Sequence, residues 1–308
     1  MAKVTVAVPT YNREKFLKQA IESVLKQTFQ DFEIIVFDNA SSYNIERLLA
    51  GFGDKRISLN KTPENIGQVG NFQRIYNYPY TSRYMMILFD DDAIHPQLLE
   101  REAGLLEANK ELVWAGSSLR FVREDKDMGK FSPITGPVPY KICDSSELTR
   151  QILLGFNLCF GSIVYRVSAI EDPFDLVTKY SKWSDRPQVI RIAQKGKAAL
   201  INAPLINYRL HAGQDSAQKD SEQFFIDYSK KLFQFYKDSL PQPLSSPDAA
   251  LWYKFTTNNL LNAVAGISHT AKDFWLNLNK FRPDFFNWKY LRPKGIFYLL
   301  KFFKKFYI

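Results

Sequence analysis

The stretch RYMMILFDDDAIHP (residues 83–96) joins an apolar run directly to three consecutive aspartates, Asp90, Asp91 and Asp92. The apolar run has the length and composition of a buried β-strand. Two unit charges about 4 Å apart repel each other by roughly 4 kcal/mol at an effective dielectric constant of about 20. A strand that ends in three adjacent carboxylates therefore needs compensation. A bound divalent cation would supply it, and so would solvation in an exposed loop.

The first half of the chain alternates strand-like and helix-like patterns. Four short apolar runs have the character of strands, namely residues 4–8, 32–37, 56–60 and 84–89. Apolar residues recur from Leu17 to Leu25 at the spacing of one helix face, and a shorter helical pattern runs from Ile45 to Leu49. This order predicts an α/β fold with a mostly parallel sheet flanked by helices.

Polar sequences follow three of these predicted strands: PTYNRE (9–14), DNASS (38–42) and DDDAIHP (90–96). Parallel strands end at the same edge of a sheet, and ligands of such sheets bind beyond the carboxyl ends of the strands. We therefore expect the three segments to converge on one crevice.

The pattern after residue 111 is more mixed. Strand character returns in three runs, 112–122, 158–167 and 198–211. A helix is predicted over 185–196, closed by Gly196. The polar residues 212–223 suggest a linker, and residues 224–278 have helical composition. We therefore predict a smaller helical region over residues 216–308.

The composition is that of a globular protein, with 45% hydrophobic and 24% charged residues among 308. The two cysteines, Cys143 and Cys159, give no disulfide framework and fit a reducing compartment. The amino terminus has polar residues and Pro9 where a signal peptide needs an apolar stretch. No apolar run approaches the roughly 20 residues of a transmembrane helix. These features predict a soluble, cytoplasmic protein.

Most of the net charge of +9 belongs to the last 28 residues, 281–308, which carry seven basic residues and one acidic residue. The same segment holds eleven aromatic residues. From Lys294 onward, apolar and basic side chains separate onto opposite sides of a helical wheel. This pattern predicts a helix at the surface of an anionic membrane, which argues against nucleic acid as the partner. The alternative is a helix that packs on the protein's own body with its lysines outward.

No glycine-rich loop for phosphates, of the type GxxxxGK[ST] or GxGxxG, occurs in the sequence. The phosphates of a bound nucleotide would then need another source of positive charge. Aspartates that hold Mg²⁺ or Mn²⁺ supply it, because hard cations prefer carboxylate and phosphate oxygens.

Four blocks in this order and spacing resemble the family 2 glycosyltransferases of the GT-A fold: VAVPTYNRE, FEIIVFDNASS, NIGQVGNFQR and MILFDDDAIHP. The resemblance covers roughly residues 3–215. It implies a Rossmann-like catalytic domain over residues 1–215, with the nucleotide-sugar part in about 1–110 and the acceptor side in about 111–215. It also implies inverting transfer of a sugar from a nucleotide-sugar, assisted by Mn²⁺ or Mg²⁺.

The resemblance assigns residues of the blocks to the nucleotide-sugar: Pro9, Thr10, Tyr11, Arg13, Asp38, Asn65, Gly67, Asn71, Asp90 and Asp91. Tyr11 is expected to stack on the base, and Asp38 to bind the edge of the base. Asn39 stands where the family often has a second aspartate, so UDP is the expected carrier while dTDP and CDP stay open. The expected metal ligands are Asp91, Asp92 and His211.

The general base expected from the resemblance lies in SDRPQVIRIAQKG (184–196), which matches the family form E-D-x-x-L-x-x-R-x-x-x-x-G incompletely. Ser184 replaces the first acid, which leaves Asp185 as the candidate base. The alternative role for Asp185 is a carboxylate that stabilises the helix start.

The segment YRLHAGQDS (208–216) resembles the end of the catalytic domain in these enzymes. There His211 would bind the metal or the pyrophosphate, and Arg209 would offset phosphate charge. The alternative for His211 is an ordinary hydrogen bond within a loop.

Together these features predict a bacterial-type enzyme at the inner face of the plasma membrane. It would add one sugar to a lipid-linked oligosaccharide or a growing surface polysaccharide. Three alternatives remain: a nucleotidyltransferase, for which PTYNRE lacks the glycines, a catalytically degenerate binder of sugar nucleotides, and a nucleic-acid-binding protein that uses the basic tail.

Overall fold

The computed structural model describes residues 2–123, 125–156, 158–171, 173–180, 184–214, 222–268, 271–279 and 285–291. The chain forms two compact units. The first comprises Met1–Ser145, Asn157–Thr178 and Ser184–Ala217. The second comprises Ser146–Phe156, Lys179–Trp183 and Gln218–Ile308.

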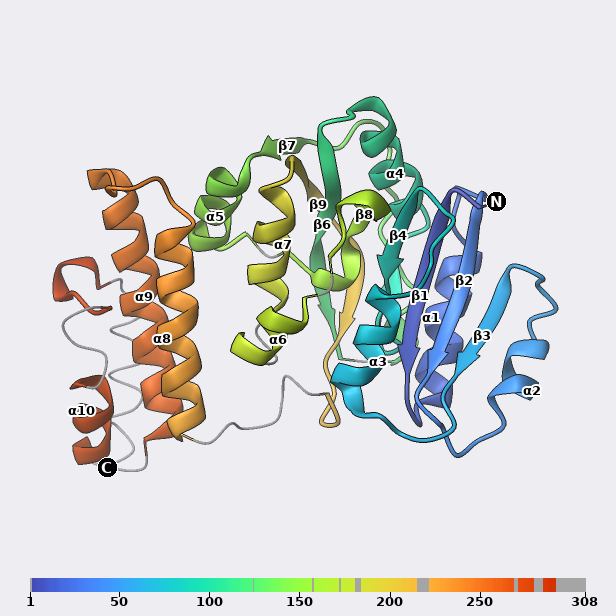
Figure 1. The fold of residues 1–308 in the computed structure, drawn as a ribbon, viewed down its shortest axis with the longest axis horizontal. Helices are drawn as coiled ribbons and strands as arrows, with labels where there is room; N and C mark the ends of the chain where they lie inside the picture. Colours follow the sequence, from blue (N-terminus) through green and yellow to red (C-terminus); the bar gives the residue numbers. More distant parts are fainter. Residues whose placement is uncertain are drawn as a thin grey trace. The chain divides into compact units, whose positions relative to one another are not determined.

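The first unit is built on a mixed sheet, which has nine strands in the described part of the chain (Figure 1). The strands are β1 Val4–Thr10, β2 Phe32–Asp38, β3 Ile57–Lys61, β4 Tyr84–Ile87, β5 Ala93–Ile94, β6 Leu112–Val122, β7 Tyr140–Cys143, β8 Val164–Arg166 and β9 Lys197–Arg209. Their order is β3-β2-β1-β4-β8-β6-β9-β5, and β7 also pairs with β9.

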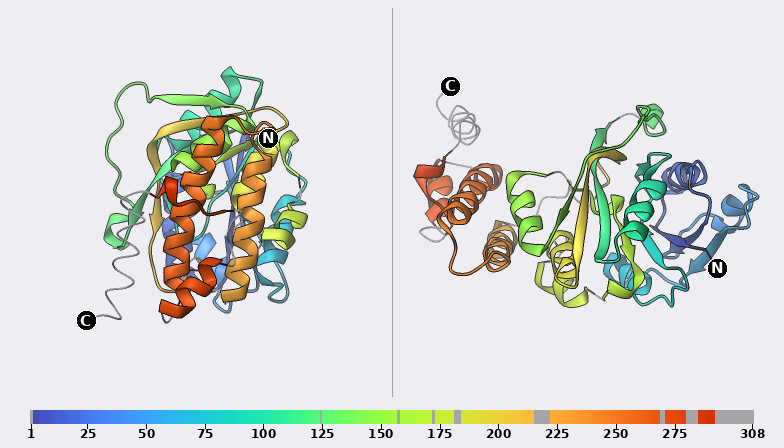
Figure 2. Two further views of the ribbon diagram at one scale, coloured as in Figure 1. Left: turned by 90° about the vertical axis from the view of Figure 1, so that its left-hand side faces the viewer. Right: turned by 90° about the horizontal axis from the view of Figure 1, so that it is seen from above.

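The first half of the sheet is parallel, as the sequence predicts. β2 pairs in parallel with both β1 and β3, and β1 pairs in parallel with β4. The second half is mixed, because β8 runs antiparallel to β4 and β6 while β6 and β9 are parallel. The expected α/β class with flanking helices is confirmed, and the helices lie on both faces of the sheet (Figure 2).

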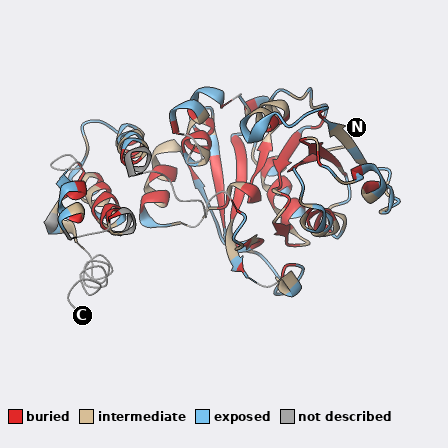
Figure 3. Ribbon diagram, turned by 90° about the horizontal axis from the view of Figure 1, so that it is seen from below, coloured by how far each residue is buried: buried red, intermediate tan, exposed pale blue. Residues whose placement is uncertain are grey.

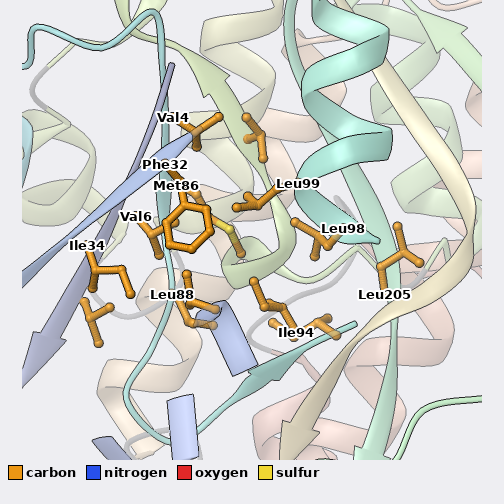
Figure 4. Packing of buried hydrophobic residues seen from close by; sticks show 14 of the residues in the cluster. Val4, Val6, Phe32, Ile34, Met86, Leu88, Ile94, Leu98, Leu99 and Leu205 are labelled. Carbon is orange, nitrogen blue, oxygen red and sulfur yellow. The ribbon is translucent and has the colours of Figure 1, made fainter. Parts of the chain in front are cut away.

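Helices α1 Glu14–Leu25 and α4 Leu98–Ala108 cover one face of the sheet. Their apolar side chains, such as Ile21 and Leu98, form one core with alternate residues of β1, β2 and β4. Figure 4 shows Val6, Ile34 and Met86 of these strands in the core with Leu98. The short α2 Ile45–Ala50 joins this core through its own apolar side. Strands β1, β2 and β4 are buried, and the outward sides of the helices are exposed (Figure 3).

Helices α3 Gly67–Tyr76 and α7 Asp185–Ala193 also pack against strands of the sheet, α3 against β1 and β2 and α7 against β6. The Asn71 amide in α3 donates a hydrogen bond to the carbonyl oxygen of Phe37 in β2, at 3.0 Å. The Trp114 indole in β6 donates to the carbonyl oxygen of Val189 in α7, at 3.1 Å. α7 confirms the helix predicted from residue 185. A further helix, α6 Phe174–Tyr180, precedes it.

The strand predicted over residues 158–167 is wrong in its first part. Residues Phe160–Ser162 form a 3₁₀ turn, η2, and only β8 is a strand. The Ser162 hydroxyl donates to the carbonyl oxygens of Ser117, at 2.9 Å, and Cys159, at 2.8 Å. These side-chain bonds take the place of strand pairing over residues 160–162.

The second unit is helical, and it contains the C-terminal region that the sequence predicts to be helical together with segments from within residues 1–215. Its main helices are α5 Ser145–Leu154, α8 Glu222–Asp238, α9 Ser246–Ile267 and α10 Ala271–Asn279. The Arg150 guanidinium forms an ion pair with Asp248 at 2.8 Å, which joins α5 to the start of α9. The Trp252 indole donates to the carbonyl oxygen of Phe233 at 3.0 Å, which joins α9 to α8.

The amphipathic helix predicted in the tail lies outside the described residues, which end at 291. In the part of the chain that the structure describes, no helix is long and apolar enough to cross a membrane.

Candidate active site

The three polar segments that follow β1, β2 and β4 meet at one end of the sheet, as predicted. The Thr10 hydroxyl donates a hydrogen bond to Asp90 Oδ2 at 2.8 Å, which connects β1 to the end of β4. The Asn12 amide N–H donates to Ser41 Oγ at 2.8 Å, which connects β1 to the loop after β2. The Ser41 N–H in turn donates to both carboxylate oxygens of Asp38, at 3.1 and 3.2 Å.

The three adjacent aspartates occupy a tight turn, closed by a hydrogen bond from the Asp92 N–H to the Phe89 carbonyl oxygen at 3.1 Å. We call residues 90–92 the aspartate turn. Each of its three carboxylates accepts hydrogen bonds that offset the repulsion between them, and Asp90 and Asp91 share one donor, Arg13. The partners come from β1, from the start of α1 and from the end of β9.

Asp90 is buried, and its carboxylate is held by two groups from the amino-terminal part of the chain. Thr10 binds Oδ2, and the Arg13 guanidinium binds Oδ1 at 3.1 Å. Burial and the neighbouring charge of Asp91 raise the pKa of Asp90 to about 7, against the opposing effect of Arg13.

Asp91 is more accessible and forms a close pair with a histidine that is distant in sequence. Its Oδ2 lies 3.0 Å from His211 Nε2 and 3.1 Å from Arg13 Nη1. The edge of the His211 ring meets the ring of Phe16, with the centroids 5.1 Å apart. The structure thus brings together two of the three predicted metal ligands.

Asp92 is the most deeply buried of the three, with 1% of its surface exposed. Its Oδ1 accepts a hydrogen bond from the Arg209 N–H at 3.0 Å. Among the described residues, no group donates a hydrogen bond to its Oδ2. Burial, followed by the charge of Asp91, raises the pKa of Asp92 well above its ordinary value.

Gly161 in η2 lies directly against the aspartate turn. A Cβ atom at this position would come within 3.1 Å of the Phe89 ring and 3.6 Å of Asp92 Oδ2. Only glycine fits here without displacing a neighbour. The sequence analysis missed this residue, because the apolar run around it resembles a strand.

Arg209 fixes the aspartate turn rather than facing an open site. Its guanidinium is buried and donates to the backbone carbonyl oxygen of Asp91 at 2.8 Å. It also binds the side chains of Asp125 and Gln19, and it stacks over the ring of Phe16 at 4.3 Å. With these contacts, Arg209 holds Asp91 and Asp92 in position. Its guanidinium is already bound by protein groups, so it does not occupy the phosphate-binding role expected from the sequence.

The residues expected at the nucleoside differ in their accessibility. Tyr11 is 43% exposed, as stacking on a base requires. Asp38 is fully buried, with both oxygens bound to the Ser41 N–H, and Pro9 is buried within β1.

A tyrosine that the sequence analysis missed lies where the strand ends meet. Burial raises the pKa of Tyr43 to about 12. The groups that also act on its hydroxyl come from all three polar segments: Thr10, Ser41, Asp38 and Asp90. The only signal in the sequence was that Tyr43 follows Asp38, the residue predicted to bind the edge of the nucleoside base, by five residues.

Asn39, Asn65 and Gly67 form one amide network that shapes the start of α3. The Asn39 amide donates to Asn65 Oδ1 at 2.8 Å and to the Gly67 carbonyl oxygen at 3.2 Å, and it accepts from the Ile66 N–H at 2.9 Å. A carboxylate at position 39 could accept the last bond but donate neither of the others. Asn39, which departs from the family pattern, thus has a structural reason to be an amide.

Asn71 is buried in α3, and both ends of its amide contact the protein. Besides its bond to Phe37, its Oδ1 accepts from Arg74 at 2.9 Å. Asn71 therefore holds α3 against the end of β2.

Asp185 is the first residue of α7, and its carboxylate accepts a hydrogen bond from the Arg186 N–H at 2.8 Å. The surrounding protein raises the pKa of Asp185 by desolvation, although Arg186 opposes this. Burial raises the pKa of Cys159, and the charges of Asp92 and Asp185 both raise it further. Both carboxylates therefore act electrostatically on the same buried thiol.

The fit of a divalent cation can be tested on these groups. Among the described residues, no three His, Cys, Asp or Glu side chains converge as a ready metal site. Asp91 and His211 are a pair of carboxylate oxygen and imidazole nitrogen, with side chains that are 15% and 18% exposed. Such a pair suits Mn²⁺, which accepts nitrogen ligands more readily than Mg²⁺, and leaves positions for phosphate and water oxygens. Asp91 and His211 therefore fit a divalent cation whose remaining coordination positions are filled by oxygen atoms of a bound ligand and of water.

Residues 5–174 match the family model described as Glycosyl transferase family 2. This stretch is more than half of the chain, so the chain belongs to this family. The resemblance stated from the sequence blocks is confirmed.

Three relatives illustrate the range of similarity. An uncharacterised glycosyltransferase of Methanocaldococcus jannaschii is 34% identical over 135 residues, which cover 42% of this chain and 46% of that protein. One of Haemophilus influenzae is 25% identical over 244 residues, covering 71% and 69%. One of Rickettsia conorii is 30% identical over 260 residues, covering 79% and 40%. The chain thus spans about half or less of the length of the first and third relatives.

Two solved structures share the fold. Residues 1–349 of TarS from S. aureus, solved in complex with UDP-GlcNAc, align with a TM-score of 0.56 at 13% identity, covering 90% of this chain and 88% of that one. The mannosyltransferase PcManGT from Pyrobaculum calidifontis, solved with GDP-Man and Mn²⁺, aligns with a TM-score of 0.50 at 15% identity, covering 98% and 86%. At these identities the likeness concerns the fold.

Proposed function

We propose that this protein transfers a sugar from a nucleoside-diphosphate sugar to a hydroxyl group of a glycan or a lipid-linked oligosaccharide, with inversion at the anomeric carbon. The observation that carries the proposal is the Asp91–His211 pair, which stands at the end of β4 beside the joined ends of β1 and β2. UDP is the expected carrier, supported by the TarS complex with UDP-GlcNAc. The donor would bind within residues 1–110 and the acceptor against residues 111–215.

The proposed donor site uses the residues of the three strand ends. The exposed ring of Tyr11 would stack on the base. Asp38, which the resemblance assigns to the edge of the base, is fully buried and would act there through the Ser41 loop that its carboxylate holds. Asn65 and Gly67 would border the sugar, in the turn that Asn39 fixes. Thr10, Pro9 and Asn71 would shape the site from behind, since their side chains are buried.

Asp91 and His211 would hold the divalent cation, with Asp92 as the third predicted ligand and as the anchor to β9. Bound there, the cation would neutralise the charge that develops on the leaving nucleoside diphosphate. Asp185 would accept the proton of the acceptor hydroxyl as that oxygen attacks the anomeric carbon. Its hydrogen bond from the Arg186 N–H would orient the carboxylate, so the helix-start role and the catalytic role support each other.

Donor binding is tested by the shift in the midpoint of thermal unfolding of the full chain with a panel of nucleotide-sugars, with and without Mn²⁺. We expect UDP-sugars to raise the midpoint more with Mn²⁺ than without it, because a ligand of the folded state stabilises it by mass action. Transfer is then measured as release of nucleoside diphosphate in the presence of acceptor. Binding without any release, with water or acceptor, would reduce the protein to a binder of sugar nucleotides.

We also propose that the protein acts in bacterial surface-polysaccharide biosynthesis, at the inner face of the plasma membrane, to which the basic tail would attach it. The charge of residues 281–308 supports this, since each basic residue near anionic lipid contributes about 1 kcal/mol.

The full chain should float with vesicles that contain phosphatidylglycerol and not with purely zwitterionic vesicles. Replacing Lys301, Lys304 and Lys305 with glutamine should weaken this binding, because it removes charges from the polar side of the predicted helix. Failure to float, together with retention of the chain on duplex DNA, would instead favour the nucleic-acid alternative.

A further inference from the structure

Arg13 contacts the aspartate turn at the position where the proposed cation would bind. Its Nη1 lies 3.1 Å from Asp90 Oδ1 and 3.1 Å from Asp91 Oδ2, so one nitrogen bridges two adjacent carboxylates. Its Nη2 donates to the backbone carbonyl oxygen of Gly213 at 3.0 Å. A single guanidinium thereby joins the start of α1, the end of β4 and the turn that follows β9.

The backbone before Arg13 is held rigidly, which fixes the point from which the side chain extends. Asn12 has a left-handed conformation with φ of 55°, which few residues other than glycine adopt. Its N–H donates to Ser41 Oγ at 2.8 Å, and its Oδ1 accepts from the Ser42 N–H at 2.8 Å. The side chain of Arg13 is 29% exposed, so the guanidinium is not enclosed in the protein core.

The contact between Arg13 and Asp91 conflicts with metal binding by the same carboxylate. Oδ2 of Asp91 is the oxygen that faces both Arg13 Nη1 and His211 Nε2. A divalent cation held by Asp91 and His211 would therefore lie beside a positive guanidinium, in a partly buried site where like charges repel strongly. Because Arg13 Nη1 and His211 Nε2 both contact this oxygen, a divalent cation at Oδ2 would compete with the guanidinium for it.

We propose that Arg13 competes with the divalent cation for the Asp91 carboxylate and exchanges that carboxylate for the diphosphate of the donor when the cation binds. The inference rests on the proposed nucleotide-sugar site. The chemistry suits the exchange, because a guanidinium binds phosphate oxygens as well as carboxylates through paired N–H groups. Metal and nucleotide would then bind cooperatively: the metal frees Arg13, and the diphosphate gives the freed guanidinium a new partner.

The test compares the Mn²⁺ affinity of the wild-type chain with that of the Arg13→Gln variant. Free Mn²⁺ is measured by electron paramagnetic resonance. Without nucleotide, Arg13→Gln should bind Mn²⁺ about tenfold more tightly, because a competing charge has been removed. With UDP present at saturating Mn²⁺, the same variant should bind UDP about tenfold more weakly, because one charge-assisted phosphate contact is lost. The two effects have opposite signs, which loss of folding alone would not produce.

Lys15→Gln is the matched control. It removes the same charge two residues further along, where the lysine pairs with Asp125 instead of the aspartate turn. A general electrostatic effect would appear in both variants, whereas direct competition would appear only in Arg13→Gln. Unchanged or weaker Mn²⁺ binding by Arg13→Gln would overturn the inference. If the wild type transfers sugar all the same, the proposed function survives that result, whereas loss of nucleotide-sugar binding by the wild type would refute the proposed function itself.

Discussion

Replacing Asp185 with asparagine should lower sugar transfer by about a hundredfold to ten-thousandfold, the usual contribution of a general base. Asparagine keeps the size of the side chain and an oxygen that can accept the hydrogen bond from the Arg186 N–H, so α7 should form as before. Affinity for the nucleotide-sugar should change little, because the residue acts on the acceptor. Single-turnover transfer and donor binding, measured on the same preparation, separate the two effects.

The pH dependence gives a second readout of Asp185. Desolvation raises the pKa of this carboxyl group above its ordinary value, so its basic form is lost as the pH falls through the raised pKa. The acid side of the kcat profile should show this loss in the wild type and not in the residual activity of Asp185→Asn. Asp54→Asn, which changes a carboxylate paired with Arg56 elsewhere in the unit, is the control. Transfer by Asp185→Asn within tenfold of the wild type would leave the residue with its helix-start role alone.

Replacing Asp91 with asparagine should abolish the dependence of donor binding on Mn²⁺ and lower turnover by about a thousandfold or more, since a Lewis-acid metal supplies several kcal/mol to such a reaction. The change removes the negative charge that His211 and Arg13 both face. Calorimetric titration with Mn²⁺ in the presence of UDP measures the loss directly. Mn²⁺ affinity equal to that of the wild type would exclude Asp91 as a ligand.

The Asp92→Asn variant should be compared with Asp91→Asn. Asparagine at position 92 keeps an oxygen that can accept the hydrogen bond from the Arg209 N–H, so only the charge of the side chain is removed. A strong loss of Mn²⁺ affinity in this variant as well would assign the metal to both carboxylates. Normal affinity would limit Asp92 to holding the turn against β9.

The parallel half of the sheet could be predicted because its strands are continuous apolar runs in a simple order. Once the strands are parallel, the polar segments after β1, β2 and β4 must lie together, and the bond between Thr10 and Asp90 shows that they do. Local patterns were sufficient here, since the position of each segment depends on the strand directly before it.

The individual roles within the aspartate turn could not be predicted, because the partners are distant in sequence. Arg13 precedes Asp91 by 78 residues, and His211 follows it by 120. Three identical side chains in a row give no local signal of which one faces Thr10, which one His211 and which one the β9 backbone. The three carboxylates acquire their different burial and different partners only when the chain folds.

The segment at residues 160–162 shows how tertiary contacts override an apolar pattern. Its composition favours a strand, yet Ser162 bonds to the backbone of Ser117 and Gly161 lies where a side chain would meet Phe89. Residues that look like ordinary core from the sequence thus line the aspartate turn.

Arg209 fastens the aspartate turn from 117 residues further along the chain, through its own N–H to Asp92 and its guanidinium to the Asp91 carbonyl. The part of the protein that would recognise the donor is therefore completed by the last strand of the sheet. A fragment cut after residue 110 would carry all three acidic side chains without the strand that orients them. Any shortened form of this protein that is meant to keep the aspartate turn in place therefore also has to keep β9.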